Sequence, residues 1–358
     1  MIAGGMGMPF KDFQPDYRNV LDAARNRRPR RLPLYEHYIA PTKMEEITGK
    51  PFAALARGDR ADKAEYFDRY CAFFRDLGYD TVSYEACVVD AIQKGECLSG
   101  RAAGLVKDRK DFEAFDFSEV ERRFWELHLE DFRALAEAMP AGMKAVGGIG
   151  NGLFETLQDI VGYTELCYLE ADDPELRTEL FAAVGELLAR IWKRFLAECA
   201  EPFAVCRFGD DLGFKSSTLL RPDDIRALVV PRYRGIVDLV HQAGKPFLLH
   251  SCGRIFEVMD DLIDGAGIDA KHSNEDQIAP FPEWVGRYGA RIGLFGGVDM
   301  NVLCLEGEAE IAGYTRAVLE ACTAQAGLAF GSGNSIPDYV PASGYLAMVG
   351  AVREARGD

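Results

Sequence analysis

Short apolar segments alternate with longer amphipathic segments along most of the chain. The short segments are rich in valine, isoleucine, leucine and phenylalanine, and the longer ones repeat apolar residues every three or four positions, as helices do. Strands that alternate with helices predict βαβ units and a parallel sheet. We predict eight strands: Leu32 to Tyr38, Asp80 to Tyr84, Met143 to Gly147, Phe203 to Phe208, Pro246 to His250, Ile268 to Lys271, Arg291 to Phe295 and Leu328 to Phe330.

Helical patterns fill most of the intervals between these strands, and their ends carry suitable residues. Asp173 can accept hydrogen bonds as an N-cap before Pro174, which suits the first helical position. Gly244 can end a helix in the left-handed conformation. The clearest predicted helices are Ala61 to Leu77, Phe117 to Met139, Pro174 to Glu198, Pro222 to Ala243 and Glu308 to Ala326.

Eight such units predict a closed (β/α)8 barrel, the TIM barrel, as one domain over residues 1–358. A helix around Asp16 to Arg28 precedes the first strand, and it should either close the bottom of the barrel or pack outside it. The segment from Ile92 to Phe115 has no clear barrel helix. We therefore expect an insertion between the second and third strands.

The charge and the cysteines narrow the class of protein. A formal net charge of -16 makes an acidic surface, which disfavours nucleic acid and anionic membranes as partners. The 9 cysteines form no C-x-x-C pair, which is typical of reduced thiols in a cytoplasm. The start, Met1 to Phe10, lacks the pattern of a signal peptide, and no apolar run is long enough to span a membrane. We expect a cytoplasmic protein.

Polar residues follow the predicted strands, and in a barrel the carboxyl ends of all strands meet on the face that carries active sites. We predict catalytic acid or base roles for four of them: His37, Glu85, Asp210 and Asp211. Four others are predicted to bind a ligand or cofactor at the rim: Gly148, Asn151, Asp299 and Asn334.

The motif from His250 to Gly253 follows a buried strand. Residues two apart on a strand point to the same side, so His250 and Cys252 can aim an imidazole and a thiolate at one spot. Both are good zinc ligands. The alternative is a core histidine with its hydrogen bonds satisfied beside a buried cysteine that behaves as a small apolar residue.

With these motifs the chain resembles the uroporphyrinogen decarboxylase superfamily, roughly from Asp16 to the C-terminus. The resemblance implies a single (β/α)8 barrel and one of two activities, decarboxylation or cobalamin-linked methyl transfer. The segments that carry it are Gly209 to Gly213 continuing to Leu220 to Pro222, His250 to Gly253, Gly296 to Asp299, and Gly331 to Pro337.

The methyltransferase branch is the closer match, because His250 and Cys252 fall on its H-x-C zinc motif. The arginine-rich arm of the decarboxylases has no counterpart, since Leu32 to His37 stands in that region. Tyr84-Glu85 also stands where decarboxylases have an aspartate after the second strand.

One departure concerns the third zinc ligand, which that branch takes from a cysteine after the eighth strand. Ser332 occupies this position. Zinc binding then needs a substitute ligand, or zinc does not bind. We predict a metal site of His250 and Cys252 with His272 and Glu275, and Asp276 and Asp211 are further substitutes.

The resulting prediction is a zinc-dependent, corrinoid-linked methyltransferase. It would move a methyl group between a small methylated compound, a corrinoid carried by a partner protein, and a thiol or folate. The alternatives are a lyase that decarboxylates a tetrapyrrole carboxylate and a non-catalytic subunit that binds a corrinoid protein.

Overall fold

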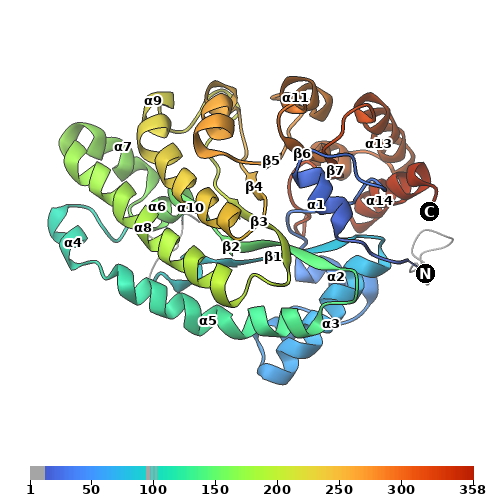
Figure 1. The fold of residues 1–358 in the computed structure, drawn as a ribbon, viewed down its shortest axis with the longest axis horizontal. Coiled ribbons are helices and arrows are strands. Elements are labelled where there is room, and N and C mark those ends of the chain that lie inside the picture. Colours follow the sequence, from blue (N-terminus) through green and yellow to red (C-terminus); the bar gives the residue numbers. More distant parts are fainter. Residues whose placement is uncertain (1–12, 94–96, 98–99, 101–102) are drawn as a thin grey trace.

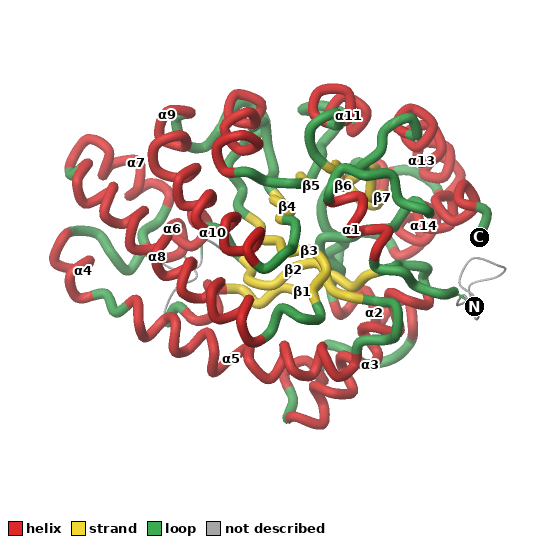
Figure 2. The backbone as a smooth tube through the Cα atoms, viewed as in Figure 1, coloured by secondary structure: helices red, strands yellow, loops and turns green. Residues whose placement is uncertain are grey.

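The computed structural model describes residues 13–93, 97, 100 and 103–358. Its centre is a curled parallel sheet of seven strands in chain order, and helices surround this sheet (Figures 1 and 2). The strands are β1 (Thr81–Cys87), β2 (Lys144–Gly150), β3 (Phe203–Gly209), β4 (Phe247–His250), β5 (Ala270–His272), β6 (Gly293–Val298) and β7 (Leu328–Ser332).

The helices mostly connect one strand to the next, as expected for right-handed βαβ units. Those on the outer side of the sheet are α3 (Arg60–Asp76), α4 (Arg109–Ala114), α5 (Phe117–Ala138), α6 (Leu153–Ile160), α7 (Tyr163–Asp172), α8 (Pro174–Glu198), α9 (Pro222–Asp224), α10 (Val230–Gln242), α11 (Phe281–Tyr288), α12 (Met300–Leu305), α13 (Glu308–Cys322) and α14 (Ala342–Arg356). Two more, α1 (Arg18–Ala24) and α2 (Pro41–Thr48), precede β1.

The predicted helix ends are confirmed where their caps were recognisable. The Asp173 carboxylate accepts a hydrogen bond from the Leu176 amide at 2.9 Å, with Pro174 at the start of α8. Gly244 follows α10 with a left-handed φ of 75°. The predicted helix Pro222 to Ala243 contains a π-helical stretch, Ile225–Val229, just before Pro231. Proline cannot donate the usual helical bond, and a π turn accommodates this gap.

The first predicted strand does not form a regular strand, so the described residues contain seven strands instead of eight. Leu34 makes one isolated parallel bridge to Phe330 of β7. Pro33 has no N–H to continue the ladder, which explains the irregularity. The Ser83 hydroxyl of β1 donates to the Glu36 carbonyl. This segment therefore lies between β7 and β1, where the first predicted strand was expected.

The expected insertion between the second and third predicted strands falls partly on residues that the structure does not describe. Residues 94–96, 98–99 and 101–102 of that segment lie outside the described residues. The described part ends in the short helix α4, whose first turn is capped by the Asp108 carboxylate. The segment from Met1 to Phe10, which lacks the pattern of a signal peptide, also lies outside the described residues.

Helix α1 closes the bottom of the sheet, which is the first of the two placements expected for it. Val20, Ala23 and Ala24 are buried against side chains from the inner face of the strands. The strand residues in this cluster are Val146, Ala204, Val205, Leu248, Ala270, Phe295 and Ala329. The contact is close, because a Cβ on Gly293 at the start of β6 would lie 2.3 Å from the Ala23 carbonyl oxygen.

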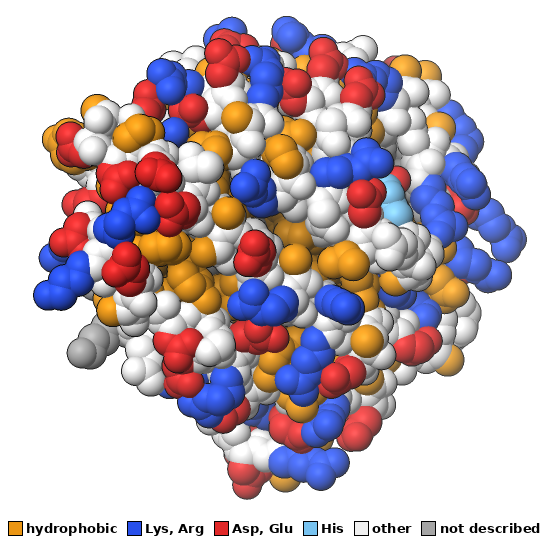
Figure 3. Space-filling model, turned by 60° about the vertical axis from the view of Figure 1, so that its left-hand side comes forward, with side chains coloured by type: hydrophobic (Ala, Val, Ile, Leu, Met, Phe, Trp, Pro, Cys, Tyr) orange, Lys and Arg blue, Asp and Glu red, His pale blue; other side chains and the backbone are white. Residues whose placement is uncertain are grey.

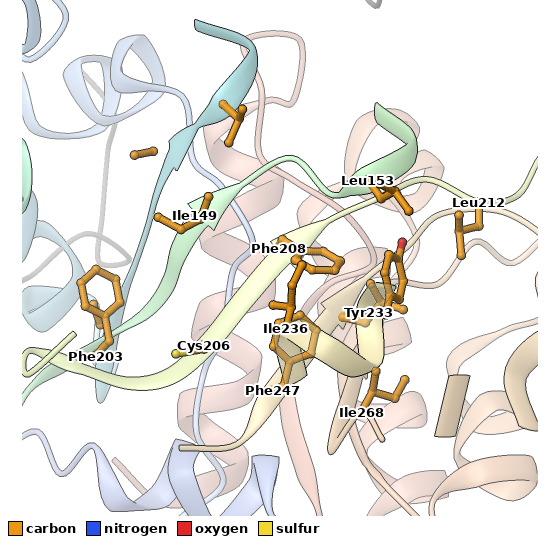
Figure 4. Packing of buried hydrophobic residues seen from close by; sticks show 14 of the residues in the cluster. Ile149, Leu153, Phe203, Cys206, Phe208, Leu212, Tyr233, Ile236, Phe247 and Ile268 are labelled. Carbon is orange, nitrogen blue, oxygen red and sulfur yellow. The ribbon is translucent and has the colours of Figure 1, made fainter. Parts of the chain in front are cut away.

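The larger core lies between the sheet and the outer helices. Figure 4 shows Phe208 of β3 and Phe247 of β4 packed with Ile236 and Tyr233 of α10. The Phe208 and Phe247 rings cross edge to face with centroids 4.8 Å apart. Burying each such ring contributes about 1.5–3 kcal/mol, so this layer fixes the strands that carry the site.

On the face shown in Figure 3, acidic and basic side chains are interleaved. None of the described helices is both long enough and apolar enough to cross a membrane.

Candidate metal centre and active site

The predicted site residues meet at the carboxyl ends of β3, β4 and β5. The register pairs Gly209 of β3 with His250 of β4, and His250 with His272 of β5. This register places two imidazoles side by side on adjacent strands. His37, from the irregular segment after Leu34, stacks on His250 with ring centroids 3.7 Å apart.

Among the described residues, two overlapping groups bring three possible ligand atoms within 4.8 Å of one another. One group is Asp211, His250 and Cys252, and the other is His37, His250 and His272. His250 belongs to both. The choice between them depends on which nitrogen of His250 faces which neighbour.

The first group has separations that suit a shared zinc ion. The His250 Nε2 lies 3.5 Å from the Cys252 sulfur and 3.9 Å from the Asp211 Oδ1. Zinc bonds of about 2.0–2.3 Å at tetrahedral angles separate two ligand atoms by roughly 3.3–3.7 Å. The separation from Asp211 is slightly longer than this range, and a small inward shift of its carboxylate would bring it within the range. The donor set of one thiolate, one imidazole and one carboxylate is suited to zinc.

The second group is less suitable, because its histidines already bond to each other. The Nδ1 atoms of His250 and His272 are 2.7 Å apart, which is a hydrogen-bond distance. Two nitrogens that share a proton are not both free to bind a metal. His272 therefore lies behind His250, on the side opposite Cys252.

Cys252 is enclosed by hydrogen-bond donors. The Asn334 amide lies 3.3 Å from its sulfur and the Ser273 hydroxyl 3.6 Å. Its own backbone amide donates to the Asp211 carboxylate at 2.8 Å, which fixes Asp211 beside it. Burial raises the pKa of the Cys252 thiol well above its usual value, and the Asp211 charge raises it further. Without a cation this thiol stays protonated at neutral pH.

Cys252 and Asn334 also line a cavity of about 20 Å³ that reaches the Trp284 side chain. This volume is enough for one water molecule. A small group can therefore lie beside the sulfur.

His37 covers one face of the His250 ring, and Glu85 and Arg207 lie beside His37. The Glu85 carboxylate accepts a hydrogen bond from the buried Arg207 guanidinium at 2.7 Å, and its other oxygen lies 3.8 Å from the His37 Nε2. Arg207 also donates to the Tyr35 hydroxyl at 2.8 Å and to the His37 carbonyl at 3.0 Å. The buried Nδ1 of His37 has no hydrogen-bond partner among the residues that the structure describes. Burial, with the neighbouring Arg207 charge, lowers the pKa of His37 well below its usual value.

Asp210 and Asp211 are neighbours in sequence, but they have different surroundings. The Asp210 carboxylate accepts from the amides of Phe154 and Glu155 at 2.9 and 2.8 Å, and from the Tyr233 hydroxyl. These contacts tie β3 to the first turn of α6, so Asp210 acts as a helix cap. Burial raises its pKa to about 6, although these hydrogen bonds oppose the shift. Only Asp211 faces Cys252.

The four residues predicted to bind a ligand are not grouped together. Asn334 contacts Cys252, as described above. Asp299 caps α12 through the Asn301 amide at 2.7 Å. Asn151 has a left-handed φ of 61° and its amide donates to Glu155 at 2.9 Å. Gly148 has a φ of 123°, and a Cβ there would lie 2.9 Å from the Phe195 ring. A side chain at position 148 would thus point toward helix α8.

Glu275, predicted as a metal ligand, lies on the same cavity as Cys252 but pairs with Lys215 at 3.1 Å. It belongs to neither of the two groups of possible ligands. Ser332 stands where the resemblance expects a cysteine ligand. Its hydroxyl donates to the Glu36 carboxylate, and its amide donates to the same carboxylate at 3.0 Å. Burial raises the pKa of Glu36 to about 8.

Two ionisable residues near the site are not among the predicted site residues, the buried Lys271 and the half-buried Glu155. The Lys271 ammonium lies 3.8 Å over the Trp284 ring and donates to the Ser273 carbonyl, and burial lowers its pKa to about 7. A lysine inside a predicted buried strand was a usable signal, because lysine is rarely buried without a partner. Glu155 accepts from the Asp211 amide at 3.3 Å. Its position in α6 gave no comparable signal.

Comparisons with known proteins agree with this architecture. A methyltransferase from Methanosarcina mazei is 17% identical with a TM-score of 0.73, and the match covers 94% of this chain and 98% of that one. A Listeria monocytogenes protein named as a vitamin-B12 independent methionine synthase is 14% identical with a TM-score of 0.48, over 91% and 99% of the two chains. At 17% identity the likeness to the Methanosarcina mazei protein shows a shared fold alone. Nothing is concluded from the second likeness.

A search of curated protein sequences finds no match. The family model described as uroporphyrinogen decarboxylase (URO-D) matches residues 100–355, which is most of the chain. This stretch includes β2 to β7 and the ligand set of Asp211, His250 and Cys252. The chain therefore belongs to the uroporphyrinogen decarboxylase (URO-D) family.

Proposed function

We propose that this protein is a zinc-dependent methyltransferase of the URO-D family. It moves a methyl group between a small methylated compound, a corrinoid carried by a partner protein, and a thiol or folate. The observation that carries the proposal is the set of ligand atoms from Asp211, His250 and Cys252, whose separations of 3.5 and 3.9 Å from the His250 Nε2 suit one zinc ion.

Bound zinc would lower the pKa of a coordinated thiol, so that a thiolate is available at neutral pH. The chain supports this chemistry in two ways. Cys252 is buried, and its raised pKa means that only a nearby cation makes it an anionic ligand. The Asn334 and Ser273 groups that point at its sulfur stabilise the thiolate form once it exists.

The missing cysteine is compatible with this proposal. Ser332 is used to bind the buried Glu36, so it is not available as a ligand. Asp211 lies on the other side of Cys252 and is held there by the Cys252 amide. We propose that Asp211 takes the third ligand position, and that Asp210 only supports the adjacent helix.

His37 and Glu85 are proposed to handle the substrate proton. The Nδ1 of His37 is buried and has no partner among the described residues, so it can accept a hydrogen bond from a substrate heteroatom. The Glu85 carboxylate lies 3.8 Å from the Nε2 of His37, and Arg207 keeps Glu85 in place. This arrangement supports the proposal that His37 and Glu85 act beside the proposed metal ligands.

A decarboxylase acting on a tetrapyrrole is the weaker candidate. Its substrate has several carboxylates and needs free cationic groups in the site. Arg207 is already bonded to Glu85, to Tyr35 and to the His37 carbonyl. Its guanidinium is therefore committed to the protein and not presented to a substrate.

The first test is the zinc content of protein purified without chelator. The variants are Cys252→Ser and Asp211→Asn, and Cys322→Ser is the matched control, because Cys322 is buried in α13 outside the ligand groups. We expect near-stoichiometric zinc in the wild type and the control, and strong loss in Cys252→Ser. Wild-type protein without zinc, or undiminished zinc in Cys252→Ser, contradicts the proposal.

The second test is activity of the zinc-loaded protein with a corrinoid protein, methylated donors and thiol or folate acceptors. Methyl transfer that is lost in Cys252→Ser supports the proposal. Tight binding of the corrinoid protein without any methyl transfer favours a non-catalytic binding subunit. Release of carbon dioxide from a tetrapyrrole carboxylate favours the decarboxylase.

A further inference from the structure

His250 and His272 form a short chain of hydrogen bonds that ends at a backbone carbonyl. Their Nδ1 atoms are 2.7 Å apart, and the His272 Nε2 lies 3.2 Å from the Ser332 carbonyl oxygen. The remaining nitrogen of His250, Nε2, faces the Cys252 sulfur at 3.5 Å. Both rings are buried.

The carbonyl at the end of this chain fixes the direction of every bond in it. A carbonyl oxygen only accepts, so the Nε2 of His272 must carry a proton and donate. A neutral imidazole has one N–H, so the Nδ1 of His272 is then a bare acceptor. The Nδ1 of His250 must therefore donate to it. The Nε2 of His250 is left without a proton and presents its lone pair to Cys252 and Asp211.

The opposite direction places a positive charge in an unfavourable position. If the Nδ1 of His272 were the donor, His272 would carry two protons and be an imidazolium. That cation would be fully buried in an interior that also contains the buried Lys271 and Arg207 side chains. Among the described residues His272 bonds to His250 and the Ser332 carbonyl and to no carboxylate. Burying a charge without a counter-ion is expensive, so both rings are neutral.

We propose that His272 is a positioning residue, which locks His250 in the tautomer whose Nε2 lone pair points at Cys252 and Asp211. Its role in metal binding rests on the proposed function, whereas the proton arrangement is a property of this chain with or without zinc. On this account His272 is not a ligand. It acts through His250, with the Ser332 carbonyl as the fixed end of the chain.

The tautomer is measured directly by 15N NMR of histidine-labelled protein after removal of metal with a chelator. The chain has 5 histidines, so single substitutions assign every signal. We expect His250 to carry its proton on Nδ1 and His272 to carry its proton on Nε2. A proton on the Nε2 of His250 overturns the proposal.

Two substitutions separate positioning from ligation. In His272→Asn, the side-chain oxygen can take the place of Nδ1 and accept from His250, whereas His272→Phe keeps the ring volume without an acceptor. We expect His272→Phe to weaken zinc binding by about 10–100-fold, as is typical for the loss of a hydrogen bond to a metal ligand. His272→Asn should stay within a few-fold of the wild type. His241→Asn, on the exposed end of α10, is the control.

The outcomes distinguish this inference from the proposed function. Equal loss of zinc in His272→Asn and His272→Phe contradicts positioning and indicates that His272 is a ligand. Unchanged zinc affinity in both variants also contradicts it. If the wild type binds no zinc, the proposed function fails, but the NMR spectrum of the metal-free protein still decides the tautomer.

Discussion

The two ends of the inner face of the sheet differ sharply, although the same strands make both. At the lower end, Leu248 and Ala270 pack against the apolar face of α1. Two residues further along the same strands, His250 and His272 face each other in a hydrogen-bond chain. The lower end is a closed apolar layer, and the upper end holds a cluster of ionisable groups.

This difference shows how the fold separates stability from chemistry. Side chains two apart on a strand point the same way, so one strand supplies a packing residue and a ligand to the same interior. The α1 helix seals one end, and the group of possible ligands lies at the other. In barrels of this type the active site lies at the carboxyl ends of the strands, and residues at the opposite face contribute mainly to stability.

The largest expected effect on stability is at the lower end. Leu248 is 0% exposed and belongs to the apolar layer that packs on α1. Leu248→Ala leaves a cavity in this layer and should lower the free energy of unfolding by about 2–5 kcal/mol. Urea denaturation measures this loss. Zinc content per folded protein should stay unchanged. Loss of zinc in this variant would show that the two ends are not independent.

Glu36 lies at the upper end, and it makes stability depend on pH because it binds its proton more tightly in the folded state than in the unfolded state. Its folded pKa of about 8 is above the usual 4.5, so between these values the unfolded state ionises while the folded state keeps the proton. This group therefore makes stability fall as pH rises through that window, on the order of 3–5 kcal/mol in total.

Glu36→Gln mimics the protonated acid: its side-chain oxygen can accept from the Ser332 amide, and its NH2 can donate to the Ser332 hydroxyl. In urea denaturation of chelator-treated protein, the variant should gain stability over the wild type at pH 8 relative to pH 5. Parallel pH profiles of the two proteins would show that Glu36 is ionised in the folded state.

A smaller effect is expected at Asp210, which the account assigns to helix capping. In Asp210→Asn one of the two α6 amides, from Phe154 or Glu155, loses its acceptor. An unmet buried amide costs about 1–3 kcal/mol in the free energy of unfolding. Zinc content should be retained, in contrast to Asp211→Asn. Loss of zinc in both variants would mean that the two aspartates act as one unit.

Parts of this picture could be predicted from the sequence, because they depend on local rules. Strand alternation alone put His250 and Cys252 on one side, and Asp173 marked the start of α8. A regular strand was predicted around Leu34 because the apolar pattern there outweighed a single proline, but the segment is irregular.

The rest of the site depends on contacts between distant segments. No local signal separates Asp210 from Asp211, since the capping amides belong to α6 and the Cys252 amide to the loop after β4. The pairing of His250 with His272 is set by the register between β4 and β5. A sequence pattern names such residues, but it does not say which of them touch.

The most direct test of the central claim is X-ray absorption at the zinc edge of the wild-type protein. We expect one sulfur ligand at about 2.3 Å and nitrogen or oxygen ligands at about 2.0–2.2 Å, with the sulfur absent in Cys252→Ser. A shell with two sulfurs, or a shell of nitrogen and oxygen that does not change in Cys252→Ser, would contradict a centre built from Asp211, His250 and Cys252.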